Sequence, residues 1–499
     1  MRLAISFRSA VIAIAGALLL STSAPVRAQE VIVVNPHAPA KSFHHFWEQM
    51  FGSGRSVLTM RESYRDDLRA TRQITDLQFV RFHGIFNDEM GVYNQDAQGN
   101  PVYNFSYVDQ VYDGLLANGV KPFVELSFMP RLLAANLTPH PFWYKPFPSP
   151  PKEPTRWAAL ISAFVNHLIE RYGRPEVEAW YFEVWNEPNI DFWNGVPKEQ
   201  TYYTLYDITV RAIKAIDPQI RVGGPATAQA AWVDRFIVHC VQNHVPFDFV
   251  SSHIYGNEKS EDIFGKHLNI SQRDMVGLAV RKVYDQVKAS AAPNTPIIWS
   301  EYNATYMNLP SNTDSAFMGP WLANNIRECD GLTAMMSYWT FSDVFEEQGI
   351  IQTPFYGGFG LIAEREIPKA AFRAFELLHQ LGDQRLPSTS ENALITERND
   401  GTVVLALWNY AGPDETAPAK SFQLQDATRA YKGYRIQVVD PQHGSALERW
   451  KAMGSPKYPS LRQIDELKQA SELAPAEQHK LTEPIVLPAH ALALVHLER

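Results

Sequence analysis

The sequence contains very little cysteine: its 499 residues include only Cys240 and Cys329. Cys240 lies in an apolar run with helical spacing and Cys329 ends a different predicted helix, so two buried free thiols are expected instead of a disulfide. The sequence also lacks CxxC and HExxH pairs and any carboxylate-rich loop, which are patterns that hold zinc or calcium. No metal and no cofactor is therefore predicted.

Positive charge is also in deficit, with 45 Lys and Arg against 54 Asp and Glu and a net charge of −9. A surface of this sign is a poor match for nucleic acid or for an anionic membrane, so neither is expected as the main partner. Hydrophobic residues make up 45% of the chain and charged residues 20%, as in ordinary soluble globular proteins. No internal repeat or low-complexity tract is seen in the sequence.

Only one apolar run stands out as a targeting element, residues 10–20, and it is too short for a membrane span. Arg2 and Arg8 precede it, and residues 26–28 offer small side chains for cleavage after Ala28. This pattern predicts a signal peptide over residues 1–28. The mature protein is then expected to be exported, periplasmic or extracellular, and free of the membrane; an uncleaved anchor is the alternative.

From residue 42 to 381 the chain alternates between strand-like and helix-like segments. Eight such alternations predict an α/β fold, a (β/α)₈ TIM barrel. The eight expected strands are residues 46–51, 79–85, 121–128, 180–189, 220–225, 247–255, 296–303 and 332–340. A doubly wound open sheet is the alternative, but no glycine-rich phosphate loop follows the first strand. The long, proline- and aromatic-rich loop 129–154 is a candidate wall of a binding site.

Beyond residue 381 the pattern changes to short strands of alternating polarity. This pattern predicts a smaller accessory β-sandwich over residues 382–499, with a charged helical insertion at 460–473. The β-branched run Val31–Val34, within the N-terminal segment 29–41, is expected to join that sandwich.

Several predicted barrel strands end on polar or aromatic residues, and the mouth of a barrel brings such ends together. These residues are His83, Asn186, Glu187, His253, Tyr255, Glu301 and Trp339. Strands four and seven lie on opposite sides of the mouth, so Glu187 and Glu301 are expected to face each other. Two facing carboxylates suit glycoside hydrolysis, in which one donates a proton and the other attacks or activates water.

Each candidate also has a structural interpretation. A single Glu at a strand end is more often the partner of a nearby Arg or Lys, and a single histidine is more often part of the core. Glu183 competes with Glu187 but lies deeper in the strand, where an ion pair with Arg81 is expected; Glu125 has the same interpretation. Two glutamates, each following an aromatic strand, favour the catalytic interpretation.

The stretch Trp185–Asn189 resembles the acid/base motif of the large clan of glycoside hydrolases built on (β/α)₈ barrels. More narrowly, the chain resembles glycoside hydrolase family 39, the family of β-xylosidases and α-L-iduronidases. Further stretches that carry the resemblance are residues 45–48, 80–85, 125–130, 249–255, 300–303, 337–343 and 355–360.

This resemblance implies roles for the candidate residues. Glu187 would be the general acid/base and Glu301 the nucleophile of a retaining mechanism. The residues implied to contact the sugar are His83, Phe128, Asn186, His253, Tyr255, Trp339, Glu346 and Glu347. Tyr255 could also orient Glu301.

The resemblance implies a β-xylosidase that removes terminal xylose from xylo-oligosaccharides, without a cofactor. Another terminal glycoside is an alternative, namely a β-galactoside, β-glucoside, α-L-arabinoside or α-L-iduronide. An iduronidase would need cationic groups for the sugar carboxylate, and the strand ends offer only Arg55 and Arg81. A carbohydrate-binding barrel without activity is the alternative from another class, and the two retained glutamates weigh against it. An oligomer is compatible with the sequence.

Overall fold

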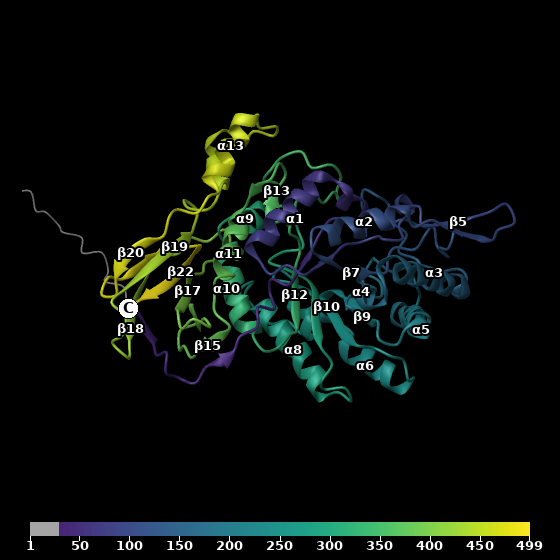
Figure 1. Ribbon diagram of the computed structural model, residues 1–499, viewed down its shortest axis with the longest axis horizontal. Helices are drawn as coiled ribbons and strands as arrows, with labels where there is room; N and C mark the ends of the chain where they lie inside the picture. The colour runs from purple at the N-terminus through teal and green to yellow at the C-terminus, as the bar shows by residue number, and fades with distance from the viewer. Residues whose placement is uncertain (1–28) are drawn as a thin grey trace, which may run out of the picture.

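The computed structural model describes residues 29–499, so the predicted signal peptide lies outside the described residues. Eight parallel strands form a closed barrel and lie beside a smaller group of antiparallel strands (Figure 1). In spatial order the barrel strands are β3 (Met50–Gly52), β4 (Phe79–Arg81), β7 (Lys121–Glu125), β8 (Tyr181–Glu183), β9 (Arg221–Thr227), β10 (Phe249–Tyr255), β11 (Ile297–Asn303) and β12 (Met335–Tyr338). The predicted TIM barrel is confirmed.

Helices follow the barrel strands and cover their outer side (Figure 1). They are α1 (Glu62–Ile74), α2 (Ser106–Ala117), α3 (Pro154–Tyr172), α4 (Arg174–Glu178), α5 (Lys198–Ile216), α6 (Val233–Gln242), α7 (Ser260–Phe264), α8 (Met275–Ala289), α9 (Pro310–Thr313), α10 (Met318–Cys329) and α11 (Ala370–Leu378). In α5 the buried residues Tyr202, Tyr206 and Ile213 recur at helical spacing, which places one apolar face on the barrel. None of the helices in residues 29–499 is long and apolar enough to cross a membrane.

The connections carry a few short elements of their own. These are the 3₁₀ turns Ser56–Met60, Asp88–Met90 and Ala228–Ala230, and the pairs β5 (Tyr93–Gln95) with β6 (Pro101–Tyr103) and β13 (Ile362–Ala363) with β14 (Ile367–Pro368). Loop 129–154 contains no helix or strand before α3 begins at Pro154.

The interior of the barrel is layered. At the N-terminal ends of the strands an apolar layer of Met50, Phe79, Phe123, Phe249, Ile298 and Met335 fills the barrel. Above it lies a charged layer, in which Arg81 contacts Glu125 and Glu183 with no solvent exposure of the three side chains. The strands end shortly after this layer, so the residues that follow them form the mouth.

Several strands are shorter than the sequence predicts. The fourth, expected over 180–189, ends at Glu183, and Trp185 and Glu187 adopt left-handed backbone conformations with φ of 74° and 44°. The Glu187 amide nevertheless donates to the carbonyl of Ala226 at 2.8 Å. Glu187 therefore lies in a turn held against the neighbouring strand β9.

The second region is a β-sandwich, as predicted. One sheet has the order β2 (Lys41–Ser42), β15 (Gln384–Leu386), β16 (Ala393–Glu397), β17 (Val403–Asn409), β22 (Ala491–Glu498), β19 (Gly433–Val439) and β20 (Glu477–Lys480); the other has β1 (Glu30–Val34), β18 (Lys420–Asp426) and β21 (Ile485–Leu487). Ile32 and Val34 of β1 are buried in the core between them. Helix α13 (Leu461–Ala470) lies within the predicted insertion 460–473 and projects from the sandwich (Figure 1), and α12 (Leu447–Ala452), which was not predicted, precedes it. Cys240 and Cys329 are buried free thiols, as expected.

Candidate active site

A cavity of about 450 Å³ opens at the C-terminal ends of the barrel strands. Glu187 and Glu301 both line it, and one oxygen of each lies within 4.8 Å of the other. This upper limit on the oxygen–oxygen distance is compatible with the roughly 5–5.5 Å between the carboxyl groups of retaining glycosidases and lies below the roughly 6.5–9.5 Å of inverting ones.

Glu301 is held on both carboxylate oxygens. Arg81 Nη1 donates to Oε1 at 2.6 Å, and the Tyr255 hydroxyl donates to Oε2 at 2.6 Å. Arg81 also reaches Glu125 at 2.8 Å and Glu183 at 2.6 Å, as expected for core ion pairs. The guanidinium is thus shared among three carboxylates and fixes the position of Glu301 relative to the strands.

Glu187 has no such cation. Its Oε1 lies 2.9 Å from Nδ1 of His253, whose Nε2 lies 3.1 Å from the Ser300 hydroxyl. Burial lowers the pKa of His253 well below its ordinary value, with the charge of Arg81 in support, so the ring is neutral. His253 therefore positions Glu187 without supplying charge.

The two carboxyl groups differ in how their charge is balanced. Burial raises the pKa of Glu187 well above its ordinary value, and the negative charge of Glu301 raises it further. Burial also raises the pKa of Glu301, but Arg81, His83 and the Tyr255 hydroxyl oppose the shift. Glu301 is consequently the member of the pair that ionises first, and Glu187 is the member that keeps its proton.

Five other predicted residues line the cavity with these glutamates: His83, Asn186, Tyr255, Trp339 and Glu347. Asn186 Oδ1 accepts from Arg81 Nη2 at 2.9 Å, which leaves its amide N–H groups to donate to a ligand. The His83 ring lies 4.8 Å from the Trp339 ring between centroids, and its Nδ1 contacts Glu125 at 2.7 Å. The imidazole and the indole, tilted by 42° to each other, together form a wall with one polar and one apolar ring.

The two consecutive loop glutamates lie in different places. Glu347 lines the cavity, where burial raises its pKa to about 8. Glu346 does not line it: its carboxylate is bound by Arg61 at 2.6 Å and by Arg55 at 3.3 Å. Two guanidinium groups therefore hold the Glu346 carboxylate outside the cavity lining, and its contact with a sugar stays a prediction.

Two further residues that were predicted to contact the sugar, Phe128 and His253, also lie outside the cavity lining. Phe128 is fully buried and packs against Trp185 and Phe192, so it supports the cavity wall from behind. His253 is also fully buried and contacts the Glu187 carboxyl where a sugar contact was expected.

The remaining lining residues come from loops that the strand pattern did not single out. They include His140, Phe142, Asp191, Gln229, Glu258, Lys259, Asp262, Tyr306 and Gln348. His140 and Phe142 belong to loop 129–154, which was predicted as a wall, and the Trp143 amide joins this loop to the Glu347 carbonyl at 2.8 Å. Burial raises the pKa of Glu258 to about 7. The lining residues outside loop 129–154 can be identified only from the folded structure. Acidic and amide side chains between strands are usually solvated, so the sequence gives no reason to single them out.

Comparison with known proteins decides the family. The sequence model of Glycosyl hydrolases family 39 matches residues 30–481. The chain belongs to this family. This family 39 protein is 34% identical to a β-xylosidase of Geobacillus stearothermophilus over 94% of the chain and 95% of that relative. It is 23% identical to the α-L-iduronidase of Mus musculus over 84% of the chain and 72% of that relative.

Solved structures agree with this assignment. The family 39 chain matches the crystal structure of a monomeric β-xylosidase from Caulobacter crescentus with a TM-score of 0.84, at 33% identity, over 94% of this chain and 99% of the other. It matches the family 39 enzyme from Xanthomonas axonopodis pv. citri with a TM-score of 0.84 at 33% identity, over 95% and 98% of the two chains. The protein is a glycosidase with a TIM barrel, and two carboxyl groups, those of Glu187 and Glu301, lie together at the barrel mouth.

Proposed function

We propose that this family 39 glycosidase is a retaining β-xylosidase that removes terminal xylose from xylo-oligosaccharides. The observation that carries the mechanism is the pair of carboxyl groups within 4.8 Å, of which only Glu301 contacts a cation. Relatives at 34% identity along nearly the whole chain are β-xylosidases, which supports the sugar.

In the first step the ionised Glu301 attacks the anomeric carbon and forms an ester bond to it. The bond from that carbon to the glycosidic oxygen breaks as Glu187 donates its proton to the leaving oxygen. Arg81 and Tyr255 hold Glu301 in line for this attack through their 2.6 Å contacts. Asn186 donates to the hydroxyl beside the anomeric carbon.

In the second step Glu187, now ionised, takes a proton from water, and the water oxygen attacks the anomeric carbon. The ester bond to Glu301 breaks, and its carboxylate is restored. The negative charge of Glu301 raises the pKa of Glu187, so its loss in the ester lowers that pKa and suits Glu187 to act as a base. Two inversions at one carbon give net retention.

The cavity favours a neutral sugar at the reacting position. Lys259 is its one lysine among the described lining residues, and none of them is an arginine. Arg55 and Arg61, the nearby guanidinium groups, are bound to Glu346. A uronic acid would need a cation for its carboxylate, so the iduronidase alternative is less well supported.

A screen of nitrophenyl glycosides on the wild type and on Glu301→Ala tests this proposal. The xyloside should be cleaved fastest by the wild type, with release of β-xylose at first, and Glu301→Ala should be inactive. If another glycoside is cleaved faster, the sugar of that glycoside and not xylose is the preferred substrate. Absence of turnover on every glycoside would favour the binding-protein alternative.

We also propose that the protein is exported and that residues 1–28 are removed. The charged start, short apolar run and small residues before Gln29 support this proposal. N-terminal sequencing of the protein recovered outside the cytoplasm should begin at Gln29. A protein that retains residues 1–28 and sediments with membranes would support the uncleaved anchor.

A further inference from the structure

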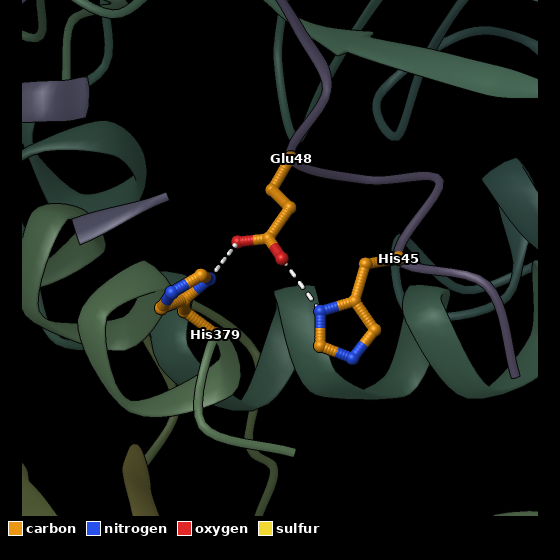
Figure 2. A group of neighbouring side chains, drawn as sticks. All are labelled: His45, Glu48 and His379. Atoms are coloured by element: carbon orange, nitrogen blue, oxygen red, sulfur yellow. Dashed lines mark hydrogen bonds and ion pairs between the residues drawn. The ribbon is translucent and has the colours of Figure 1, made fainter. Parts of the chain in front are cut away.

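A second cluster of histidine and carboxylate side chains lies at the other end of the barrel. His45 and Glu48 stand in the segment just before β3, and His379 follows the end of α11. Figure 2 shows the two imidazoles on either side of the Glu48 carboxylate, each directed at one of its oxygens. Strand β3 begins at Met50, so this cluster is at the N-terminal ends of the strands and away from the catalytic mouth.

The distances within the cluster are short. His45 Nδ1 lies 2.5 Å from Glu48 Oε1, and His379 Nδ1 lies 2.8 Å from Glu48 Oε2. One donor atom from each of the three side chains lies within 4.8 Å of the others. Zinc binds imidazole nitrogen and carboxylate oxygen at about 2.0–2.2 Å, so neighbouring ligands of one ion lie roughly 3–3.4 Å apart. To hold one ion, the His45 nitrogen would need to move away from Glu48 by roughly 0.5–0.9 Å and the His379 nitrogen by roughly 0.2–0.6 Å, with both turned toward the same point.

The Glu48 carboxylate also needs a counter-charge. Its side chain has no solvent exposure, and among residues 29–499 its hydrogen-bond and ion-pair partners are the two histidines, with no lysine or arginine. The hydrogen bond to Glu48 raises the pKa of His379 above its ordinary value, so a proton held at this contact supplies part of the counter-charge. A divalent ion bound between Glu48 and the two imidazoles would take the place of that proton.

The surroundings leave room for such an ion. The cluster lines an open groove of about 700 Å³, which also contains Asp76, Asp383, Asp400 and the cation Arg398. The His379 side chain is 43% exposed, so an ion can reach it from solvent. Water from the groove can complete the coordination, and three aspartates against one arginine leave the field of the groove attractive to cations.

We propose that His45, Glu48 and His379 form a zinc site that fastens the start of the barrel to its last helix. The same junction holds the sandwich, because the Phe43 amide donates to the Asp383 carbonyl at 2.7 Å and β2 pairs with β15. The ion would therefore cross-link segments 331 residues apart in the chain, at the point where barrel and sandwich meet. Its role is structural, since the cluster is separate from the catalytic carboxylates.

Titration of the chelator-treated full chain with Zn²⁺ by calorimetry tests this site. One Zn²⁺ per chain should bind to the wild type and raise its melting temperature. Glu187→Gln/Glu301→Gln is the matched control, because it removes the other nearby carboxylate pair, and it should bind Zn²⁺ as the wild type does. His379→Gln should bind at least about tenfold more weakly, since even residues that only orient a metal ligand account for about 10- to 100-fold in affinity.

Two results would overturn the proposal. One is a wild type that takes up no Zn²⁺ or gains no thermal stability from it, which would leave a hydrogen-bonded cluster only. The other is binding that Glu187→Gln/Glu301→Gln abolishes, which would assign the ion to the catalytic mouth. Both results are measured on the wild type and on the Glu187→Gln/Glu301→Gln control, so they do not depend on whether His379→Gln folds. If His379→Gln does not fold, His45→Gln takes its place.

Discussion

A glutamate is buried against a histidine at each end of the barrel, and the pKa values of the two glutamates shift in opposite directions. At the mouth, Glu187 lies 2.9 Å from His253, and at the other end Glu48 lies 2.5 Å from His45. Burial and the charge of Glu301 raise the pKa of Glu187. Burial alone would also raise the pKa of Glu48, but hydrogen bonds from His379 and His45 lower it.

The comparison teaches that burial does not decide the charge of a carboxyl group in this protein. Glu187 has a second anion as its neighbour and a histidine that stays neutral, so it holds a proton. Glu48 has two imidazole donors and no second anion in contact, so it is an anion. The same residue types thus give a protonated glutamic acid at one end of the barrel and an ionised, hydrogen-bonded glutamate at the other.

The strongest test at the mouth is Glu301→Ala. Loss of the nucleophile should reduce kcat on aryl xylosides by about 10⁴- to 10⁶-fold, the range seen when residues of a nucleophilic catalytic unit are removed. The substitution also removes the anion beside Glu187, so the pKa of Glu187 should fall. Kinetics and titration of the Glu187 carboxyl by infrared difference spectroscopy measure the two effects. Residual activity near that of the wild type would assign the nucleophile elsewhere.

Glu187→Ala should reduce kcat/KM on xylo-oligosaccharides by about 10²- to 10⁴-fold, because general acid catalysis contributes that much. On substrates with good leaving groups, azide should restore turnover and give a β-xylosyl azide, since a small anion needs no general base. Glu183→Ala is not suited as a matched comparison for kinetics, because it frees a charge on the buried Arg81. Absence of azide rescue would point to another acid.

Tyr255→Phe removes one of the two contacts that hold Glu301. A hydrogen bond to a charged group is worth about 1.5–3 kcal/mol, so kcat should fall about 10- to 100-fold. Unchanged kcat with a raised KM would instead assign Tyr255 to sugar binding alone. Steady-state kinetics on one aryl xyloside separate the two outcomes.

Glu48→Gln tests the opposite end. The change leaves two imidazoles facing a neutral amide in a buried position, which should cost about 1–3 kcal/mol and lower the melting temperature. Differential scanning calorimetry measures the effect. A fall in kcat at an unchanged melting temperature would contradict the contrast between a catalytic mouth and a structural opposite end.

The smallest expected effect comes from Glu258→Gln. Glu258 lines the cavity, and its negative charge helps to raise the pKa of Glu187. Activity needs protonated Glu187 and is lost as the pH rises through its pKa. Removal of the Glu258 charge should therefore move the basic limb of kcat/KM to lower pH, by less than about one pH unit. A shift to higher pH would contradict this electrostatic account.

Much of the fold was predictable because it depends on local pattern. Eight strand–helix alternations gave the barrel, and the sandwich with its N-terminal strand followed from the change in strand texture. Strand ends were less predictable: the apolar and aromatic run 180–185 is typical of one long strand, yet the strand ends at Glu183. The residues after Glu183 are buried because they pack around the barrel mouth. The hydrophobic periodicity of the sequence does not distinguish such a buried turn from a buried strand.

The site shows the same division. The structure places six residues predicted at strand ends around one cavity: Glu187, Glu301, His83, Asn186, Tyr255 and Trp339. His253, Phe128 and Glu346 lie outside its lining and contact Glu187, Phe192 and Arg61, respectively, which the sequence did not predict. Side-chain orientation at a strand end depends on contacts with distant segments, which a linear pattern does not contain.

By itself, the sequence determined which residues could react: two glutamates at strand ends, in a chain with the family 39 motifs. The tertiary structure decided which glutamate keeps its proton, because that depends on Arg81 reaching Glu301 and not Glu187. It also brought His379 to Glu48 across 331 residues, although no metal-binding spacing is present in the sequence. Charge compensation acts over a few ångströms, so only the fold determines which side chains supply it.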